Sequence, residues 1–303
     1  MLRSKISSWR EYLTPVTHKS TFFSSGEITP EEFTLSGDYL THMFPTWRWN
    51  GNEESLKNAS VRDFLPEGKQ FLVTRKVPSS VRANAFFEAG AMGPSAFIFD
   101  EEELSKSTAD TDPSPLANPE ASQDIDEAIG ELEISESIGS RDGDDDEIII
   151  KSDENKRYYD LYITYSTSYR VPKMYIVGYN AQGSPLTADE MFEDITKEYR
   201  HKTATIEKLP FYKGTVISVS IHPCKHANVM KVLLEKIRQV KKRERDQTEQ
   251  SQLQSTESME DDWEDLQDDI NDTLRVDQYL VVFLKFITGI IPSIEHDYTM
   301  EGW

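Results

Sequence analysis

The stretch TVISVSIHPCKH, from Thr215 to His226, holds the only cysteine of this 303-residue chain. Its first seven residues alternate apolar and polar side chains, which predicts a half-buried strand. From Ala227 to Val240 apolar residues recur at helical spacing, which predicts an amphipathic helix. Cys224 is therefore expected at a strand-to-helix junction, where the helix dipole and the flanking basic and imidazole side chains favour the thiolate.

Two interpretations of Cys224 stay open on these residues alone. A thiolate at such a junction would be a nucleophile. A lone cysteine is as readily a small buried hydrophobe without chemistry. The neighbouring His222 is expected to brace the turn at Pro223, and His226 is a candidate proton carrier.

Charge is concentrated in one part of the chain. The net charge is −21, and residues 100–147 alone contain eighteen Asp and Glu against Lys106 and Arg141, which gives −16. Such a composition cannot bury enough surface to fold alone, so we expect residues 82–156 to be a disordered insertion. An acidic chain is repelled by phosphates, which argues against nucleic-acid binding. A single cysteine and the lack of a signal peptide fit a reducing cytosol.

Residues 1–19 predict a short amphipathic helix. Apolar residues recur at intervals of four and three, and serines and cations occupy the other face before Pro15. The pattern is typical of a helix lying in the lipid interface, with membrane contacts from Leu2, Ile6, Trp9 and Leu13. The alternative is that this stripe packs on the protein's own core. No stretch reaches the ~20 apolar residues of a membrane-spanning helix.

The rest of the chain predicts an α+β fold. Capping boxes begin helices at Thr29 and Thr187. The aromatic, β-branched runs 158–165 and 173–179 are expected to pair as a hairpin, with a further strand over 70–77 and a last helix over 274–291. The expected organisation is a membrane-binding helix (1–19), two parts of one core (20–81 and 157–242), the insertion (82–156), an acidic loop (243–272), and a C-terminal helix and tail (273–303).

Four motifs occur along the chain: YYDLY at 158–162, RVPKMY at 170–175, HPC at 222–224 and HDYTMEGW at 296–303. Together they closely resemble the autophagy ubiquitin-conjugating-like enzymes, the autophagy-related protein 3 family. The resemblance covers nearly the whole chain and is weakest in the insertion. It implies a ubiquitin-conjugating-type core, an antiparallel sheet flanked by helices. It also implies that Cys224 carries a ubiquitin-like modifier as a thioester and passes its C-terminal glycine to phosphatidylethanolamine.

The same resemblance implies the partners and the location. They are the ubiquitin-like modifier, its activating enzyme, phosphatidylethanolamine membranes and a ligase-like modifier conjugate that stimulates the transfer. The protein would be cytoplasmic and recruited peripherally to autophagosome precursor membranes. We expect no cofactor and no metal, because ATP is used upstream and no phosphate-cradling glycine loop occurs in the chain.

One departure from ordinary ubiquitin-conjugating enzymes concerns the oxyanion. Those enzymes carry an asparagine after His-Pro, and Cys224 occupies that place here, so the oxyanion donor is unassigned. The resemblance implies that Thr203 supports the site, through a hydroxyl that could donate a hydrogen bond. An ordinary turn threonine is the alternative.

Two segments predict docking sites. Trp263 and Leu266, in an acidic WEDL sequence, resemble the motif that adds a strand to the sheet of the autophagy modifier. In the insertion, Ile125, Ile129 and Leu132 form one apolar stripe consistent with a helix that forms on the activating enzyme. The alternatives are a solvated loop and a transient helix without a partner.

Two other functions remain as alternatives. A non-catalytic membrane adaptor would have a buried Cys224, and Cys224→Ala would leave its function intact. A thiol hydrolase would release free modifier without accumulating an adduct.

Overall fold

The computed structural model describes residues 11, 13–50, 61–88, 156–200, 202–212, 215–252 and 275–296. The chain divides into two compact units, one of residues 1–100 with 153–303 and one of residues 101–152. All described residues belong to the first unit, which has the expected α+β architecture. In this described part, no helix combines the length and the apolar character needed to cross a membrane.

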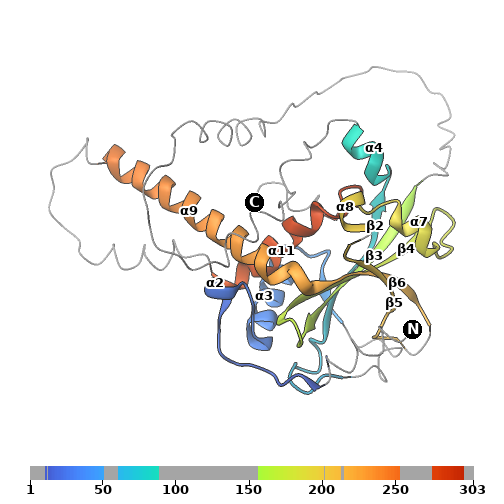
Figure 1. The fold of residues 1–303 in the computed structure, drawn as a ribbon, viewed down its shortest axis with the longest axis horizontal. Coiled ribbons are helices and arrows are strands. Elements are labelled where there is room, and N and C mark those ends of the chain that lie inside the picture. Colours follow the sequence, from blue (N-terminus) through green and yellow to red (C-terminus); the bar gives the residue numbers. More distant parts are fainter. Residues whose placement is uncertain are drawn as a thin grey trace. The chain divides into compact units, whose positions relative to one another are not determined.

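A six-stranded sheet in the order β1-β2-β3-β4-β6-β5 forms the centre of this unit (Figure 1). Every neighbouring pair is antiparallel. The predicted hairpin is confirmed, since β3 pairs with β4 along its whole length. The strands are β1 (Arg48–Trp49), β2 (Phe71–Ser79), β3 (Arg157–Ser166), β4 (Val171–Asn180), β5 (Ala204–Lys208) and β6 (Ile217–Ile221).

Two helices begin as the sequence predicts. Thr29 and Glu32 form a capping box at α3, as Thr187 and Glu190 do at α7. Each box satisfies backbone N–H groups that have no partner inside the helix. The helices are α2 (Phe22–Ser25), α3 (Pro30–Met43), α4 (Ala83–Glu88), α7 (Ala188–Phe192), α8 (Lys197–Arg200), α9 (His226–Gln252) and α11 (Tyr279–Thr288), with 3₁₀ turns η2 (Pro223–Lys225) and η3 (Val276–Gln278).

Helix α11 is the centre of the apolar core. It contacts α3 and α9, and Leu280, Phe283 and Ile287 have no exposed surface. A helix that is apolar nearly all round must be buried on several sides, and eight of the ten residues of α11 are buried. The first turns of α9 pack close to α11, and this packing sets where the Cys224 turn lies.

A second apolar cluster lies at the β5–β6 connection. Phe211, in that connection, stacks on Phe71 of β2 with ring centroids 3.9 Å apart. Tyr162 and Tyr175, from β3 and β4, belong to the same cluster. The connection therefore covers part of the sheet with its own side chains.

Three boundaries differ from the sequence prediction. The insertion does not begin at residue 82, because 83–88 form α4 and Ala83 is fully buried. The acidic loop does not begin at 243, because α9 continues to Gln252. The last helix is shorter than expected, since its first turn is the 3₁₀ turn η3. Polar helical sequence and 3₁₀ turns leave no clear hydrophobic period, so such ends are hard to locate.

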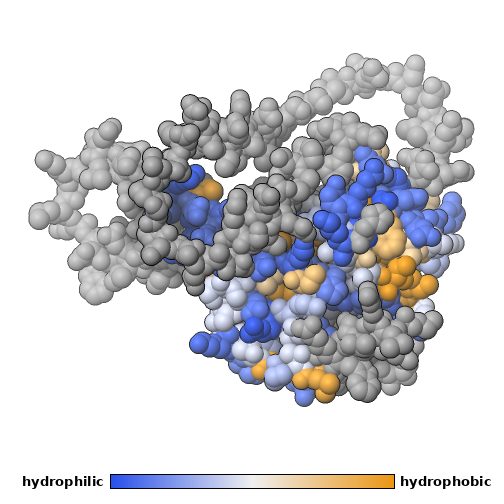
Figure 2. Space-filling model, in the orientation of Figure 1, coloured by the Kyte–Doolittle hydropathy of each residue, from blue (hydrophilic) through white to orange (hydrophobic). Residues whose placement is uncertain are grey.

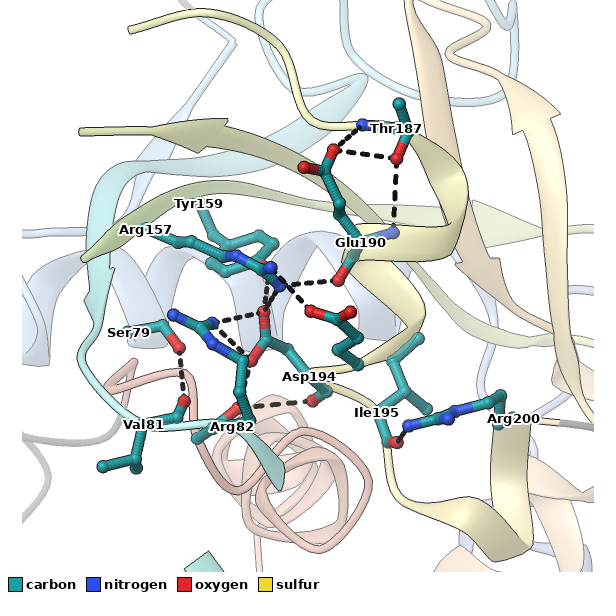
Figure 3. Close-up of polar contacts among 12 residues, drawn as sticks. Ser79, Val81, Arg82, Arg157, Tyr159, Thr187, Glu190, Asp194, Ile195 and Arg200 are labelled. Atoms are coloured by element: carbon teal, nitrogen blue, oxygen red, sulfur yellow. Dashed lines mark hydrogen bonds and ion pairs between the residues drawn. The ribbon is translucent and has the colours of Figure 1, made fainter. Parts of the chain in front are cut away.

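One buried carboxylate holds the two core segments that flank the insertion (Figure 3). Asp194 accepts hydrogen bonds at 2.7 and 2.8 Å from Arg82 and at 2.8 Å from Arg157. Tyr159 donates to the same carboxylate, and burial together with Asp194 raises the pKa of this phenol. We call Arg82, Arg157, Tyr159 and Asp194 the Asp194 clamp.

Candidate active site around Cys224

Cys224 lies in η2, the 3₁₀ turn that joins β6 to α9, and its side chain is exposed. Its neighbours Pro223 and His226 are buried. The short turn therefore directs Pro223 and His226 inward and leaves the thiol at the surface. The interpretation of Cys224 as a buried hydrophobe is wrong, and so is the buried cysteine that the adaptor alternative required.

His222 holds this turn in place. It is the N-cap of η2, and its ring Nδ1 accepts a hydrogen bond of 3.2 Å from the backbone N–H of Cys224. This contact requires an unprotonated Nδ1 and occupies the N–H of the cysteine. The ring also meets Tyr169 edge-on, with centroids 5.3 Å apart. Tyr169 belongs to none of the motifs found in the sequence, so its contact with His222 could not be predicted from them.

Thr203 meets the turn through its backbone. Its carbonyl oxygen accepts a hydrogen bond of 2.8 Å from the His222 N–H. Its hydroxyl, in a side chain that is only 5% exposed, donates to the carbonyl of Tyr199 at 3.3 Å. The Thr203 carbonyl is thus hydrogen-bonded to the His222 backbone, while the Thr203 hydroxyl is hydrogen-bonded to the Tyr199 carbonyl in α8.

His226 does not act as a proton carrier at neutral pH. The ring is 1% exposed and packs on Phe283 and Phe286 of α11. Its Nδ1–H donates to the carbonyl of Pro172 at 2.9 Å, and Nε2 has no hydrogen-bond partner among the described residues. Burial lowers the pKa of His226 to about 4, so the ring is neutral. Its place is in the core that anchors α9.

An ion pair connects the strands on either side of β6. Lys173 Nζ on β4 lies 2.8 Å from Glu207 Oε2 on β5. Burial opposes both charges, but the Tyr175 ring, 4.7 Å from the Lys173 Nζ, and the Glu207 carboxylate raise the pKa of Lys173, and Lys173 lowers the pKa of Glu207. The pair stays ionised at neutral pH and ties β4 to the strand that follows Thr203.

Glu11 joins the N-terminal segment to the β3–β4 turn. Its carboxylate accepts hydrogen bonds from the hydroxyls of Ser166, Thr167 and Ser168, and from the Thr167 N–H at 2.8 Å. Burial alone would raise the pKa of Glu11, but these donors outweigh it and hold the pKa below its usual value. The same turn carries Tyr169, which touches His222.

An apolar patch lies at the exposed edge of the sheet. Ile206 of β5 and Ile217 of β6 are 54% and 53% exposed, and Figure 2 shows apolar surface over these strands. Among the described residues β5 pairs on one side only, and no described strand covers its other edge. This edge belongs to the strand pair that ends at His222, which makes it a surface on which a partner of the thiol could lie.

Most predicted binding residues fall in ranges outside those that the structure describes. Of the predicted membrane contacts only Leu13 is described, and its 77% exposure means that it does not pack on the described core. The other membrane contacts, the docking pair and the insertion stripe lie outside the described residues: Leu2, Ile6, Trp9, Trp263, Leu266, Ile125, Ile129 and Leu132. Within the described ranges no group of three metal-ligating side chains comes together.

Comparisons with known proteins agree on one family. Residues 32–298 match the family described as "Autophagocytosis associated protein, active-site domain". The chain is 56% identical to autophagy-related protein 3 of Vanderwaltozyma polyspora and of Saccharomyces cerevisiae, over the full length of both chains in each case. Autophagy-related protein 3 of Kluyveromyces lactis is 54% identical, again over the full length of both. The matched region includes β2 to α11 and the Cys224 turn.

Proposed function

Because this chain belongs to the autophagy-related protein 3 family, we propose that it is a conjugating enzyme of autophagy that carries a ubiquitin-like modifier on Cys224 and passes it to phosphatidylethanolamine. The observation that carries the proposal is the exposed Cys224 thiol on a turn held by His222. An exposed thiol at a fixed place is what a carrier of a bulky protein requires. A buried cysteine could not accept one.

The first step is a thioester exchange. The Cys224 thiolate attacks the carbonyl carbon of the thioester that joins the modifier to its activating enzyme. The new C–S bond forms as the old one breaks, and the thiolate of the activating enzyme leaves. No nucleotide is used in this step, because the energy of activation is kept in the thioester.

The second step transfers the acyl group to lipid. The neutral amine of phosphatidylethanolamine attacks the carbonyl carbon, an amide forms, and the Cys224 thiolate leaves while the amine proton passes to solvent. The N-terminal segment, through Leu2, Ile6, Trp9 and Leu13, would hold the enzyme on the membrane and so keep the amine close to the thioester. The exposed Leu13 side chain is in line with this role.

Residues around the thiol act as positioning groups. His222 fixes the Cys224 turn, and because its ring takes the Cys224 N–H, that N–H is not a free oxyanion donor in this arrangement. The Thr203 hydroxyl is bound to Tyr199 at 3.3 Å, near the long limit for a hydrogen bond. A small rotation would release it to stabilise the oxyanion.

Two binding events would complete the cycle. Trp263 and Leu266 would dock the modifier, and the stripe of Ile125, Ile129 and Leu132 would bind the activating enzyme. The protein would act in the cytoplasm and at autophagosome precursor membranes, where a ligase-like modifier conjugate would stimulate transfer. No cofactor is needed for either step.

The test is adduct formation with purified activating enzyme, ATP and modifier. Wild type should give an adduct that thiol reagents cleave, and Cys224→Ser should give one that resists them, because an oxygen ester replaces the thioester. Cys224→Ala should give none. Addition of phosphatidylethanolamine vesicles should discharge the wild-type adduct into modified lipid.

The outcomes separate the proposal from its alternatives. If neither the wild type nor the serine variant forms an adduct while both bind modifier, the protein is an adaptor. If free modifier is released from modified lipid, the protein is a thiol hydrolase. A urea unfolding curve for each variant shows whether the substitution leaves the fold intact.

A further inference from the structure

One helix carries positive charge in a strongly acidic chain. Between His226 and Arg243, α9 has six Lys and Arg residues and a single carboxylate, and its last nine residues add Arg245 and three carboxylates, whereas the whole chain has a net charge of −21. The cations gather toward the end of the described side chains, at Lys236, Arg238, Lys241, Lys242 and Arg243. This part of α9 extends away from the sheet (Figure 1).

These cations have few partners within the fold. Arg238, Lys242 and Arg243 are exposed, and no residue whose side chain is described, which in α9 means residues up to Arg243, forms a hydrogen bond or an ion pair with them. Arg238 and Lys242 are four residues apart and therefore lie on one face of the helix, a turn from each other. We call Arg238, Lys241, Lys242 and Arg243 the basic end of α9.

The chain comes back to the other end of the same helix. The Tyr279 hydroxyl donates to the carbonyl of Gly26 at 2.6 Å. A Cβ on Gly26 would lie only 2.1 Å from the carbonyl oxygen of Ala227 and 2.7 Å from the Lys231 nitrogen. Tyr279, and with it the start of η3 and α11, therefore lies beside the first turns of α9.

Residues 253–274 connect the far end of α9 to the segment that contains Tyr279. Gln252 ends α9, about 30 Å beyond Lys231 at 1.5 Å per residue. Residues 253–274 must cover that distance in the reverse direction. Fully extended, the 22 residues of this connection could span roughly 75 Å, so it is long enough to cover the return distance and to let its acidic part reach α9. Charges interact over ~10 Å in salt solution, so carboxylates that reach this distance from α9 would be attracted to its cations.

The sign of the charge on this segment is opposite to that of the helix. Residues 257–272 hold nine carboxylates and no cation, and they include Trp263 and Leu266. We propose that the basic end of α9 is the docking surface for the acidic segment 257–272 of the same chain. The segment lies along the helix through exposed ion pairs, each of which is weak and sensitive to salt. Several weak pairs in one tethered chain act together.

The contact has a consequence that rests on the proposed function. If Trp263 and Leu266 dock the modifier, the modifier must draw this segment away from α9, so the helix and the modifier compete for it. Reversal of the charge at Arg238 and Lys242 should then tighten modifier binding by roughly two- to fivefold, which is what the loss of two exposed ion pairs gives. The contact itself does not depend on any activity of Cys224.

The direct test places a nitroxide in the acidic segment of the full-length chain. Met259→Cys in a Cys224→Ala background gives one labelling site, and broadening of α9 amide resonances reports proximity. We expect strong broadening over residues 238–243 at low salt and its marked weakening at about 0.5 M salt, where the Debye length falls to roughly 4 Å. Arg238→Glu with Lys242→Glu should abolish the broadening at low salt.

The matched control reverses two other exposed lysines, Lys197→Glu with Lys208→Glu, and changes the net charge by the same amount. This control should keep the broadening. Equal broadening in all three proteins, or none in wild type at low salt, overturns the proposal. Binding to vesicles of phosphatidylcholine with phosphatidylserine provides the other arm. If reversal at α9 weakens vesicle binding but does not affect the broadening, the surface binds anionic lipid and the proposal is wrong.

This experiment is independent of the proposed function. If no adduct forms on Cys224, the proposed function fails, but the broadening of the α9 resonances still tests the contact.

Discussion

The backbone N–H of His222 donates a hydrogen bond of 2.8 Å to the carbonyl oxygen of Thr203. This contact joins the residue before β5 to the end of β6, and it fixes the start of the turn that carries Cys224. The hydrogen bond is made by backbone atoms, so it can form whichever residue occupies position 203. What the threonine hydroxyl adds must therefore be measured separately.

Thr203→Val should keep this backbone link and remove the hydroxyl. We expect thioester formation on Cys224 to remain near the wild-type rate and transfer to lipid to fall roughly tenfold or more, as for loss of a donor to a developing oxyanion. Thr203→Ser keeps a hydroxyl and should stay close to wild type. Adduct formation with activating enzyme, ATP and modifier gives the first rate, and single-turnover discharge of the preformed adduct gives the second. Equal discharge by the valine and serine variants would rule out a chemical role for the hydroxyl.

Acidification should destabilise the protein through His226. Its folded pKa of about 4 lies below the ordinary value of 6.5, so protons bind preferentially to the unfolded chain as pH falls below 6.5. The contribution of the neutral His226 ring to the free energy of unfolding is fully present above pH 6.5 and is lost progressively down to pH 4. At pH 5 the loss is about 2 kcal/mol. Urea unfolding at pH 7.5 and pH 5 measures it, and His226→Gln, which cannot titrate, should lose less over the same interval.

Asp194→Asn should destabilise the fold by roughly 3–5 kcal/mol, because it leaves two partly buried arginines without their buried counter-charge. The Arg82 and Arg157 side chains are only 24% and 15% exposed. Glu193→Gln is the matched control, since Glu193 also pairs with Arg157 but is 52% exposed. It should cost less than about 1 kcal/mol. Similar losses of unfolding free energy in the two variants would mean that the Asp194 clamp contributes little.

Glu11→Ala should loosen the β3–β4 turn. The Thr167 N–H loses the carboxylate that accepts its hydrogen bond, so its amide should exchange with solvent roughly tenfold faster. Because the folded pKa of Glu11 is lowered, the contact is fully present above the ordinary pKa of 4.5 and is lost as pH falls through the lowered value. Hydrogen exchange at pH 7 tests the first point. Glu31→Ala, at a largely exposed glutamate, should leave Thr167 unchanged.

Gly26→Ala should cost roughly 3 kcal/mol or more, since it adds a side chain at φ +73° and a Cβ 2.1 Å from the Ala227 carbonyl oxygen. Gly183 offers a control, because its φ is +80° but nothing lies within 4 Å of its Cβ. Gly183→Ala should show only the cost of the backbone conformation, about 1 kcal/mol. Thermal unfolding of both variants separates crowding from strain, and equal shifts would contradict the packing of α2 on α9.

The sequence was sufficient for elements with strong local signals. Both capping boxes, the β3–β4 hairpin and the strand before Cys224 follow from residues near one another in the chain. β1 was missed because it is only two residues long, and β5 was missed because its exposed, mixed sequence resembles a loop. Its strand conformation comes from pairing with β6, which is a tertiary effect.

The site was predictable in part. Cys224 and His222 follow from the local motif, but the burial of His226 depends on Phe283 and Phe286, which lie more than fifty residues away. Nothing in the local sequence separates a histidine that faces solvent from one that faces α11. Glu11 and Tyr169 were missed for the same reason, because their contacts join distant parts of the chain.

The Asp194 clamp also bears on how this protein can be rebuilt. Arg82 and Arg157 bind the same carboxylate, so the fold itself sets the separation of the two points between which residues 83–156 run. The entropic cost of closing a loop grows only slowly with its length. A fluorescent reporter domain spliced between residues 89 and 155 should therefore leave the sheet and the Cys224 turn folded, and new chain termini opened there should be tolerated as well.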